Sequence, residues 1–265
     1  MIFSLLIIKK DNMAPIIFFV EGNIGSGKST FLKNVETYFE NNSRVQFLQE
    51  PVDIWKNTQD VDGSNILEHF YSDMERFCYA FQSFAFISRI KQLDMIDQNA
   101  DYVFIERSVH CDRNVFASAC HDSNMMKDIE WQIYNTWFEW MEQKYNNIFN
   151  TARYIYLQCS AATAYQRIGT RGRPEETGID IKYLETLNTK HNDWLVSNPK
   201  TIILDAEQNF LDSDILKKAI DKVVDTTTPV TKSSNISPYH NIDWKSMADK
   251  AAIAAKQSSK TSQTL

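Results

Sequence analysis

The sequence has few of the residues that mark disulfide-rich or metal-binding proteins. Its 265 residues include four cysteines, and none forms a C-x-x-C pair or a Cys/His array with zinc spacing. Reduced thiols of this kind are typical of cytosolic proteins. We therefore expect a cytoplasmic protein without disulfides. A mitochondrial location stays open, although no Arg-rich, acid-free transit segment is visible.

Long apolar runs and an excess of positive charge are also missing. The apolar stretch Met1–Ile8 is too short to span a membrane, and charged residues follow it. The formal net charge is −6, with 34 acidic against 28 basic residues. Proteins that coat nucleic acid usually show a basic face. We expect neither membrane nor nucleic acid as a partner, whereas a local basic cluster can still hold a small anion.

Short apolar runs alternate with helical periodicity through most of the chain. This pattern predicts an α/β fold, with a five-stranded parallel sheet that has helices on both faces. The expected strands are Ile16–Val20, Val45–Leu48, Tyr102–Ile105, Tyr154–Leu157 and Thr201–Leu204. The expected helices are Ser29–Phe39, Asp73–Gln98, Asp112–Ala119, Met126–Tyr145, Ala161–Arg167, Asp180–Val196 and Ser213–Val224, with a loop at Val61–Asn65. We divide the chain into an extension at 1–14, one domain at 15–225 and a Ser/Thr/Lys-rich flexible tail at 226–265.

Glycine is scarce, and three of the seven glycines lie within Gly22–Ser29. The segment reads G-N-I-G-S-G-K-S and matches G-x-x-x-x-G-K-[ST] between an expected buried strand and a helix. Glycines let several backbone N–H groups point at one anion, and the helix N-terminus adds to the attraction. We expect these residues to bind the phosphates of ATP: Gly22, Asn23, Ile24, Gly25, Ser26, Gly27, Lys28, Ser29 and Thr30. Lys28 reaches the terminal phosphates, and the Ser29 hydroxyl is a candidate Mg²⁺ ligand.

Charged residues follow the second and third expected strands, where open α/β sheets place their ligands. A carboxylate at Glu50 can take a proton from an attacking hydroxyl. Glu106 can hold Mg²⁺ or its waters, and Arg107 can stabilise a transferring phosphoryl group. By position alone, each could equally be an ordinary surface charge.

The expected helix Asp73–Gln98 places Gln82 and Arg89 together on a face next to its apolar stripe. An amide and a guanidinium on so apolar a helix need partners if they are buried. A flat heterocycle with donors and acceptors would satisfy both, because Gln can read a base edge at two points. Asp112 can orient Arg89. The alternative is that both side chains are solvated.

A second basic group comprises Arg167, Arg171 and Arg173, on a helix end and the following loop. Such local positive charge in an acidic chain suits a triphosphate. Glu175 and Glu176 come next, and they either pair with the arginines or bind a sugar hydroxyl.

Taken in order, these blocks make a chain that resembles the deoxyribonucleoside kinases, specifically the deoxycytidine and deoxyguanosine kinase branch. The resemblance covers about Ile16 to Val224, through G-N-I-G-S-G-K-S-T, E-P-V-x-x-W, F-Q-x-x-A-x-x-S-R-I, E-R-S-V-x-x-D-R and R-G-R-x-E-E-x-G-I. It implies a three-layer P-loop NTPase-type fold with an Arg-rich lid, and transfer from Mg²⁺-bound ATP, or another nucleoside triphosphate, to a nucleoside. It also implies a homodimer, which agrees with the three tryptophans of the Met126–Tyr145 helix.

The resemblance supplies a role for each matching position. Glu50 would be the base for the sugar 5′-hydroxyl, assisted by Lys28 and Arg107, with Glu106 and Ser29 toward Mg²⁺. The remaining substrate contacts would be Gln82, Arg89 and Asp112 on the base, Trp55, Phe81 and Phe116 around it, and Tyr71 and Glu176 on the sugar 3′-hydroxyl. Arg167, Arg171 and Arg173 would form the lid. The charged Arg89–Asp112 pair predicts deoxycytidine or a purine deoxynucleoside rather than thymidine.

Where the family often has Asp before Phe near the donor base, this chain has Asn209, which leaves the donor preference open. Two other functions remain. A nucleoside monophosphate kinase would need an arginine near the acceptor oxygen, in the place of Glu50. A non-enzymatic nucleotide-binding module would lack part of the set Lys28, Ser29, Glu50, Glu106 and Arg107, and all five residues are present.

Overall fold

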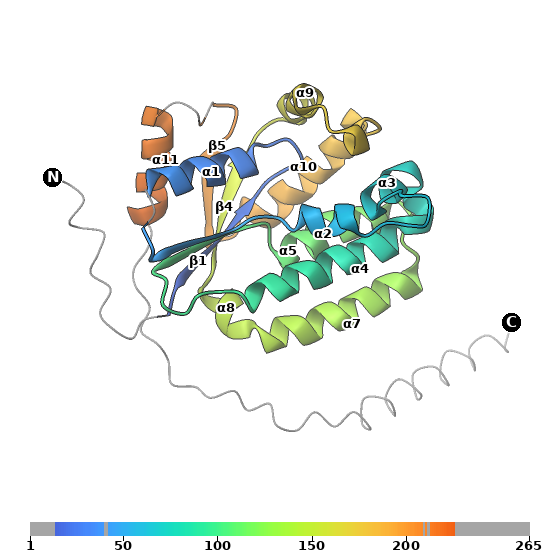
Figure 1. The fold of residues 1–265 in the computed structure, drawn as a ribbon, viewed down its shortest axis with the longest axis horizontal. Coiled ribbons are helices and arrows are strands. Elements are labelled where there is room, and N and C mark those ends of the chain that lie inside the picture. Colours follow the sequence, from blue (N-terminus) through green and yellow to red (C-terminus); the bar gives the residue numbers. More distant parts are fainter. Residues whose placement is uncertain (1–13, 40–41, 209, 211–212, 226–265) are drawn as a thin grey trace, which may run out of the picture. The chain divides into compact units, whose positions relative to one another are not determined.

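The computed structural model describes residues 14–39, 42–208, 210 and 213–225 (Figure 1). The expected tail at 226–265, residues 1–13 of the expected extension and Asn209 lie outside the described residues. No helix among the described residues is long and apolar enough to cross a membrane.

The centre of the domain is a parallel sheet of five strands, which confirms the expected fold class. The strands are β1 (Ile16–Glu21), β2 (Val45–Leu48), β3 (Tyr102–Glu106), β4 (Arg153–Gln158) and β5 (Thr201–Asp205). Their order is β2-β3-β1-β4-β5, so β1 is central and pairs with β3 on one side and β4 on the other. The carboxyl ends of β1, β2 and β3 therefore meet at one edge of the sheet, where the phosphate loop begins.

Helices cover both faces of the sheet, as the alternating pattern predicts. They are α1 (Lys28–Tyr38), α2 (Val52–Asn57), α3 (Ile66–Ser72), α4 (Met74–Leu93), α5 (Val109–Cys111), α6 (Ser118–Asp122), α7 (Asp128–Lys144), α8 (Asn146–Thr151), α9 (Ala161–Arg171), α10 (Ile181–Leu195) and α11 (Ser213–Asp225). A π-helical segment, η1 (Asp112–Ala117), joins α5 to α6, and a 3₁₀ turn, η2 (Pro174–Glu176), follows α9.

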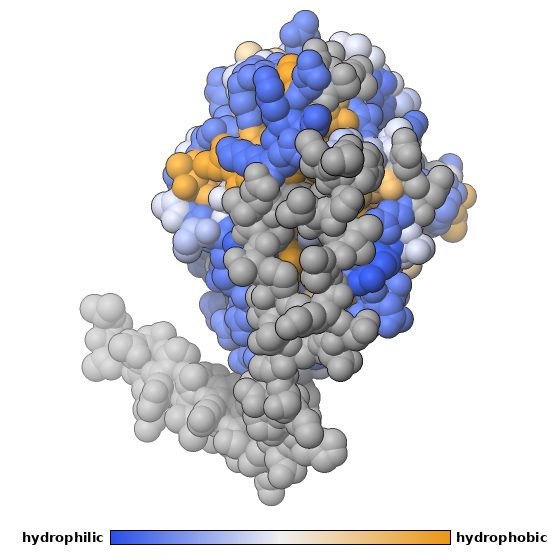
Figure 2. All heavy atoms as spheres, turned by 90° about the vertical axis from the view of Figure 1, so that its left-hand side faces the viewer, coloured by the Kyte–Doolittle hydropathy of each residue, from blue (hydrophilic) through white to orange (hydrophobic). Residues whose placement is uncertain are grey.

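Strand β1 shows how the two layers form. Phe18 and Val20 pack into the core beneath α1, α9 and α11, whereas Ile17 and Phe19 pack into the core formed with α4, α7 and α8. Figure 1 shows these groups of helices on opposite sides of the sheet. Because successive side chains of a strand point to opposite faces, a continuous apolar run is buried on both. On the face that carries α1 and α11, most described residues are hydrophilic, with smaller hydrophobic areas between them (Figure 2).

Several expected helix boundaries are wrong. The helix predicted at Asp73–Gln98 ends at Leu93, and a separate helix, α3, precedes it. Asn65 begins α3 with a capping box, because its side chain accepts from Glu68 N while the Glu68 side chain accepts from Asn65 N. Asp73 then ends α3 and caps α4 by accepting from Arg76 N. Helices α2 and α8 were not expected, and α9 runs on to Arg171.

Candidate active site

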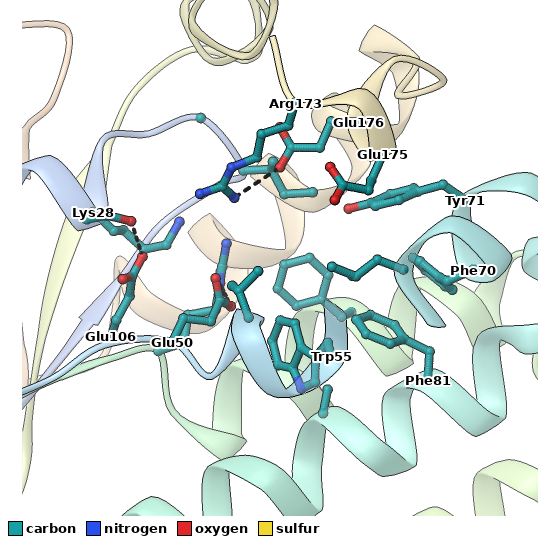
Figure 3. Close-up of a pocket in the computed structure, with 18 of the residues that line it drawn as sticks. Lys28, Glu50, Trp55, Phe70, Tyr71, Phe81, Glu106, Arg173, Glu175 and Glu176 are labelled. Atoms are coloured by element: carbon teal, nitrogen blue, oxygen red, sulfur yellow. Dashed lines mark hydrogen bonds and ion pairs between the residues drawn. The ribbon is translucent and has the colours of Figure 1, made fainter. Parts of the chain in front are cut away.

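One pocket opens at the carboxyl edge of the sheet and extends between α2, α3 and α4 on one side and η2 on the other (Figure 3). Most of the residues predicted for the site line it. They are Ile24, Gly25, Gly27, Lys28, Ser29, Thr30, Glu50, Trp55, Tyr71, Phe81, Gln82, Arg89, Glu106, Arg107, Asp112, Phe116, Arg171, Arg173 and Glu176. Four predicted residues do not line it: Gly22, Asn23, Ser26 and Arg167.

The phosphate loop adopts a conformation that requires glycine. Gly22, Gly25 and Gly27 have φ values of 146°, 79° and 94°, a region that residues with a Cβ rarely occupy. A Cβ at Gly22 would lie 2.8 Å from the Leu157 carbonyl oxygen. The glycines therefore let the loop backbone pack against β4 and curve around an anion.

Lys28 sits at the bottom of this loop and is buried. Its Nζ donates to the carbonyl oxygens of Gly22 at 3.1 Å and Asn23 at 2.8 Å. Burial and the nearby charge of Arg107 together lower the pKa of Lys28 to about 8. An anion bound in the loop would oppose both effects, so this lysine is suited to hold the terminal phosphates of a nucleotide.

The predicted loop residues outside the pocket support it from behind. Asn23 donates from Nδ2 to the Leu184 carbonyl at 2.8 Å, which ties the loop to α10. Arg167 donates from Nη1 to the carbonyl oxygens of Ser26 at 3.4 Å and Ala206 at 2.8 Å. The structure thus separates Arg167 from Arg171 and Arg173, the two arginines of the group that line the pocket.

Ser29 and Glu106 meet beside the loop. The Ser29 hydroxyl donates to Glu106 Oε1 at 2.8 Å, although the two residues are 77 positions apart. A hydroxyl and a carboxylate are the oxygen ligands that Mg²⁺ prefers. Among the described residues, no group of three or more His, Cys, Asp or Glu side chains is placed to hold a metal ion. The pair therefore fits a Mg²⁺ ion that takes its other ligands from phosphates and water.

The middle of the pocket is a buried network of two arginines and two carboxylates. Arg89 donates from Nε to both carboxylate oxygens of Asp112 at 2.9 Å and from Nη2 to Glu50 Oε1 at 2.7 Å. Arg107 Nε lies 3.2 Å from the same Glu50 oxygen. Although burial raises the pKa of Glu50, the charges of Arg89, Arg107 and Lys28 lower it to about 2. Glu50 is therefore a carboxylate at neutral pH.

Asp112 differs from Glu50 because it is more deeply buried. Burial raises the pKa of Asp112 to about 6, despite the opposing charge and hydrogen bond of Arg89. Its two bonds fix the guanidinium of Arg89 in one plane, as the sequence led us to expect for this pair.

Aromatic side chains line the far end of the pocket (Figure 3). The rings of Trp55 and Phe81 meet edge to face with 5.4 Å between their centroids, and the centroids of the Phe70 and Phe81 rings are 4.7 Å apart. Gln82 is 1% exposed, and its Nε2 has no hydrogen-bond partner among the described residues. The alternative that Gln82 and Arg89 are solvated is therefore wrong. A buried, unpaired amide beside a fixed guanidinium is suited to read the edge of a ring with donors and acceptors.

The segment after α9, with Arg173, Glu175 and Glu176, lies over the pocket (Figure 3). Glu176 accepts hydrogen bonds from Arg171 and from Arg173, the latter at 3.5 Å, and Glu175 forms an ion pair with Lys56 at 2.7 Å. Glu176 thus pairs with the arginines, which was one of the two alternatives, whereas Glu175 pairs with a lysine of α2 instead. The contact of Glu176 with a sugar hydroxyl stays a prediction. Tyr71 faces the same region; burial and the charge of Glu176 raise its pKa.

Sequence reasoning missed five residues of the pocket wall: Val52 and Lys56 on α2, Leu67 and Phe70 on α3, and Tyr183 on α10. A signal for α3 was present, because Asn65 and Glu68 have the spacing of a capping box. Tyr183 had no such signal, since only the packing of α10 brings it to the site.

Comparison with known proteins places these features in a family. A family model described as deoxynucleoside kinase matches residues 18–229. Human (Homo sapiens) deoxycytidine kinase is 37% identical over 195 residues, which cover 67% of this chain and 74% of that protein. Deoxycytidine kinase 2 of Gallus gallus is 34% identical over 206 residues, which cover 71% and 76%. Mitochondrial deoxyguanosine kinase of Xenopus laevis is 30% identical over 218 residues, which cover 72% and 81%.

Proposed function

The chain belongs to the deoxynucleoside kinase family of ATP-dependent enzymes, and from this premise we propose that it phosphorylates the 5′-hydroxyl of deoxycytidine or of a purine deoxynucleoside, in preference to thymidine. The product would be the 5′-monophosphate, made for nucleotide salvage. The observation that carries the proposal is the layout of one pocket. The phosphate loop lies at one end, the buried Gln82 amide and the aromatic rings lie toward the other, and Glu50, held by the Arg89 guanidinium, lies between them (Figure 3).

Glu50 is suited to take the proton from the attacking hydroxyl. Its carboxylate is fixed by Arg89 at 2.7 Å and Arg107 at 3.2 Å, so it needs little rearrangement when the substrate arrives. The Arg107 guanidinium stacks over the Phe116 ring at 4.7 Å and points toward the same place, where negative charge develops on the transferring phosphoryl group. Catalysis then rests mainly on positioning and charge stabilisation.

Lys28 and the loop amides hold the donor phosphates in this proposal, and Arg171 and Arg173 cover them. Bound Mg²⁺, held at Ser29 and Glu106, would neutralise phosphate charge during transfer. Closure of the lid would exclude water and limit wasteful hydrolysis of the donor. The donor is ATP or another nucleoside triphosphate. The sequence links the choice between them to Asn209, which lies outside the described residues.

The preference for the base rests on Gln82, Arg89 and Asp112. Asp112 accepts hydrogen bonds from Arg89 Nε and so fixes the orientation in which the guanidinium can contact a base. Such a donor suits an acceptor nitrogen or oxygen on a cytosine or purine ring, and Gln82 supplies a second contact through its unpaired amide.

Steady-state kinetics with the four deoxynucleosides and their monophosphates, each with ATP and with UTP, test the proposal. We expect kcat/KM to be highest for deoxycytidine or a purine deoxynucleoside, and the inactive control Lys28→Met sets the background. A clear preference for thymidine would refute the base assignment alone. Activity only on monophosphates would refute Glu50 as the base and leave a nucleoside monophosphate kinase.

A homodimer completes the proposal, because the outer face of α7 is apolar and exposed. Ile129, Ile133 and Trp137 are 63%, 42% and 57% exposed, and Ile87 on the neighbouring α4 is 51% exposed. Exposed apolar patches of this kind often mark subunit interfaces. Light scattering of Trp137→Glu should give the monomer mass, whereas the control Val196→Glu, at an exposed apolar residue directly after α10, should stay dimeric. A monomeric wild-type protein would refute the dimer.

A cytoplasmic location remains part of the proposal. All four cysteines are free and buried, as expected for a protein in a reducing compartment. Fractionation of expressing cells, with probes for the mitochondrial matrix, tests this placement.

A further inference from the structure

The last residue of β1, Glu21, is a fully buried carboxyl at the end of an apolar strand. It is 0% exposed, and its Oε1 accepts a hydrogen bond from the Ser108 backbone N–H at 2.9 Å. Oε2 has no hydrogen-bond partner among the described residues. Burying such a group is costly, and an apolar residue would pack in its place without that cost. The charge of Arg107 and the Cys111 side chain also act on this carboxyl. Its hydrogen bond to the Ser108 backbone is the contact that can fix the course of the chain.

That contact lies in a turn with an unusual backbone. Arg107, directly before Ser108, has φ of 64°, in the left-handed region that residues other than glycine rarely adopt. Strained conformations of this kind persist only where the surroundings fix them, and they gather at functional sites. Two bonds fix this one: Arg107 N donates to the Val20 carbonyl at 3.0 Å, and Ser108 N donates to Glu21. Both acceptors belong to the end of β1.

The turn decides where the Arg107 side chain goes. From it, the guanidinium donates to the Gly22 carbonyl at 2.9 Å and reaches Glu50 with Nε at 3.2 Å. A relaxed backbone at Arg107 would swing the side chain away from both. Glu106, in contrast, is positioned by the pairing of β1 with β3, in which it lies opposite Val20.

The geometry points to Glu21 as a positioning residue, whose carboxyl holds the Arg107–Ser108 turn so that Arg107 meets Glu50 and the transferring phosphoryl group. The inference rests on the proposed function and adds a residue to it. Glu21 touches neither the pocket nor the reacting atoms and acts through Arg107. A purely structural role would instead make Glu21 a stabiliser of the fold, without a specific link to the chemical step.

Two variants separate these roles. Glu21→Gln keeps an acceptor for Ser108 N–H, and Glu21→Met keeps the size and removes the acceptor. We expect Glu21→Gln to keep kcat within about threefold and Glu21→Met to lose about 10- to 100-fold in kcat, because small displacements of catalytic groups cost up to about 10²-fold. KM for the nucleoside should change less than kcat. Equal losses in both variants, or a wild-type kcat in Glu21→Met, would overturn the inference.

A double-mutant cycle with Arg107→Ala adds the test of mechanism. If Glu21 acts through Arg107, Glu21→Met should change kcat by less than about threefold in the Arg107→Ala background, because the two residues are coupled. Losses that multiply in full would show independent, structural effects and refute the inference. Should Glu21→Met fail to fold, Glu21→Asp replaces it: its shorter side chain withdraws the acceptor, so a wild-type kcat there would overturn the inference too.

Hydrogen exchange of the amides at residues 106–111 tests the turn without any activity measurement. Exchange should be faster in Glu21→Met than in the wild type and in Glu21→Gln; unchanged exchange in Glu21→Met would contradict the role of Glu21. A wild-type protein inactive on every deoxynucleoside would refute the proposed function, whereas the exchange result would still decide whether Glu21 holds the turn.

Discussion

Two sets of arginine and carboxylate side chains border the same pocket, and they differ in how far water reaches them. The network of Arg89, Asp112, Glu50 and Arg107 at the middle of the pocket is here called the floor set. In it, the side chains of Arg89 and Asp112 are 5% and 2% exposed. In the lid set, those of Arg171 and Arg173 are 33% and 37% exposed, and both pair with Glu176, whose own side chain is 10% exposed. The chemistry of the pairs is the same, so burial makes the difference.

Burial holds the side chains of the floor set in place. The arginines of the lid set are more exposed, so they can exchange partners. An ion pair in water contributes about 0–1 kcal/mol, because solvent screens the charges. Loss of one partner from a buried pair costs far more, since the remaining charge has no water to solvate it. The floor set is thus held in place before any ligand binds. In the proposed function, the arginines of the lid set would leave Glu176 and turn to the phosphates when a nucleotide binds.

The largest expected effect falls on the catalytic carboxylate of the floor. Glu50→Gln should lower kcat by a factor on the order of 10²–10⁴, as expected for a lost general base. Steady-state kinetics measure the loss, and Glu36→Gln, a change at an exposed glutamate of α1, is the control. A near-normal kcat in Glu50→Gln would remove Glu50 from the mechanism.

The next largest effect separates the floor from the lid by stability. Asp112→Ala leaves the Arg89 charge with half of its partners, and we expect a loss of about 3–5 kcal/mol in the free energy of unfolding. Glu176→Ala, the matched change in the lid, should cost about 0–1 kcal/mol. Urea unfolding monitored by tryptophan fluorescence measures both. Similar losses for the two variants would mean that burial does not distinguish the two sets.

A smaller effect concerns the pH dependence of kcat/KM, which reports groups of the free enzyme. Asp112, with a pKa of about 6, takes up a proton as the pH falls, and Arg89 then loses its carboxylate partner. Lys28, with a pKa of about 8, loses its charge as the pH rises. We expect kcat/KM for the nucleoside to fall below about pH 6 and kcat/KM for ATP to fall above about pH 8. Glu50 adds no limb in this range, since its pKa is about 2.

The variant Asp112→Asn serves as the control for the acid limb. It cannot ionise, so the fall near pH 6 should disappear while the alkaline limb stays. If the acid limb persists in this variant, another group is responsible for it.

The smallest expected effect is in the lid itself. Glu176→Gln weakens the pairs to Arg171 and Arg173 and removes a candidate ligand of the sugar 3′-hydroxyl. We expect KM for the nucleoside to rise by about tenfold, which corresponds to a loss of roughly 1.4 kcal/mol in binding free energy. KM for ATP should change little. Glu185→Gln, on the exposed side of α10, is the control. An unchanged KM for the nucleoside would leave Glu176 with the arginines alone.

The sequence by itself determined the features that depend on local pattern. The glycines of Gly22–Ser29 can adopt positive φ values without a steric cost, so the motif predicts the loop and its use of Lys28. The alternation of apolar runs with helical periodicity likewise predicts a parallel sheet with two helical layers. Helical spacing put Gln82 and Arg89 on one face, and the structure adds the Asp112 contact that the sequence suggested.

Tertiary packing decided what the local pattern leaves open. Whether a charge is solvated or buried depends on the elements packed over it, so only the structure shows that Gln82 and Arg89 are enclosed. The same holds for Arg167, which the sequence groups with Arg171 and Arg173 and the fold turns toward the phosphate loop. From the sequence alone, Glu21 is only a polar residue at the end of a strand. It contacts Ser108 only because β1 and β3, 80 or more residues apart in the chain, become neighbours in the sheet.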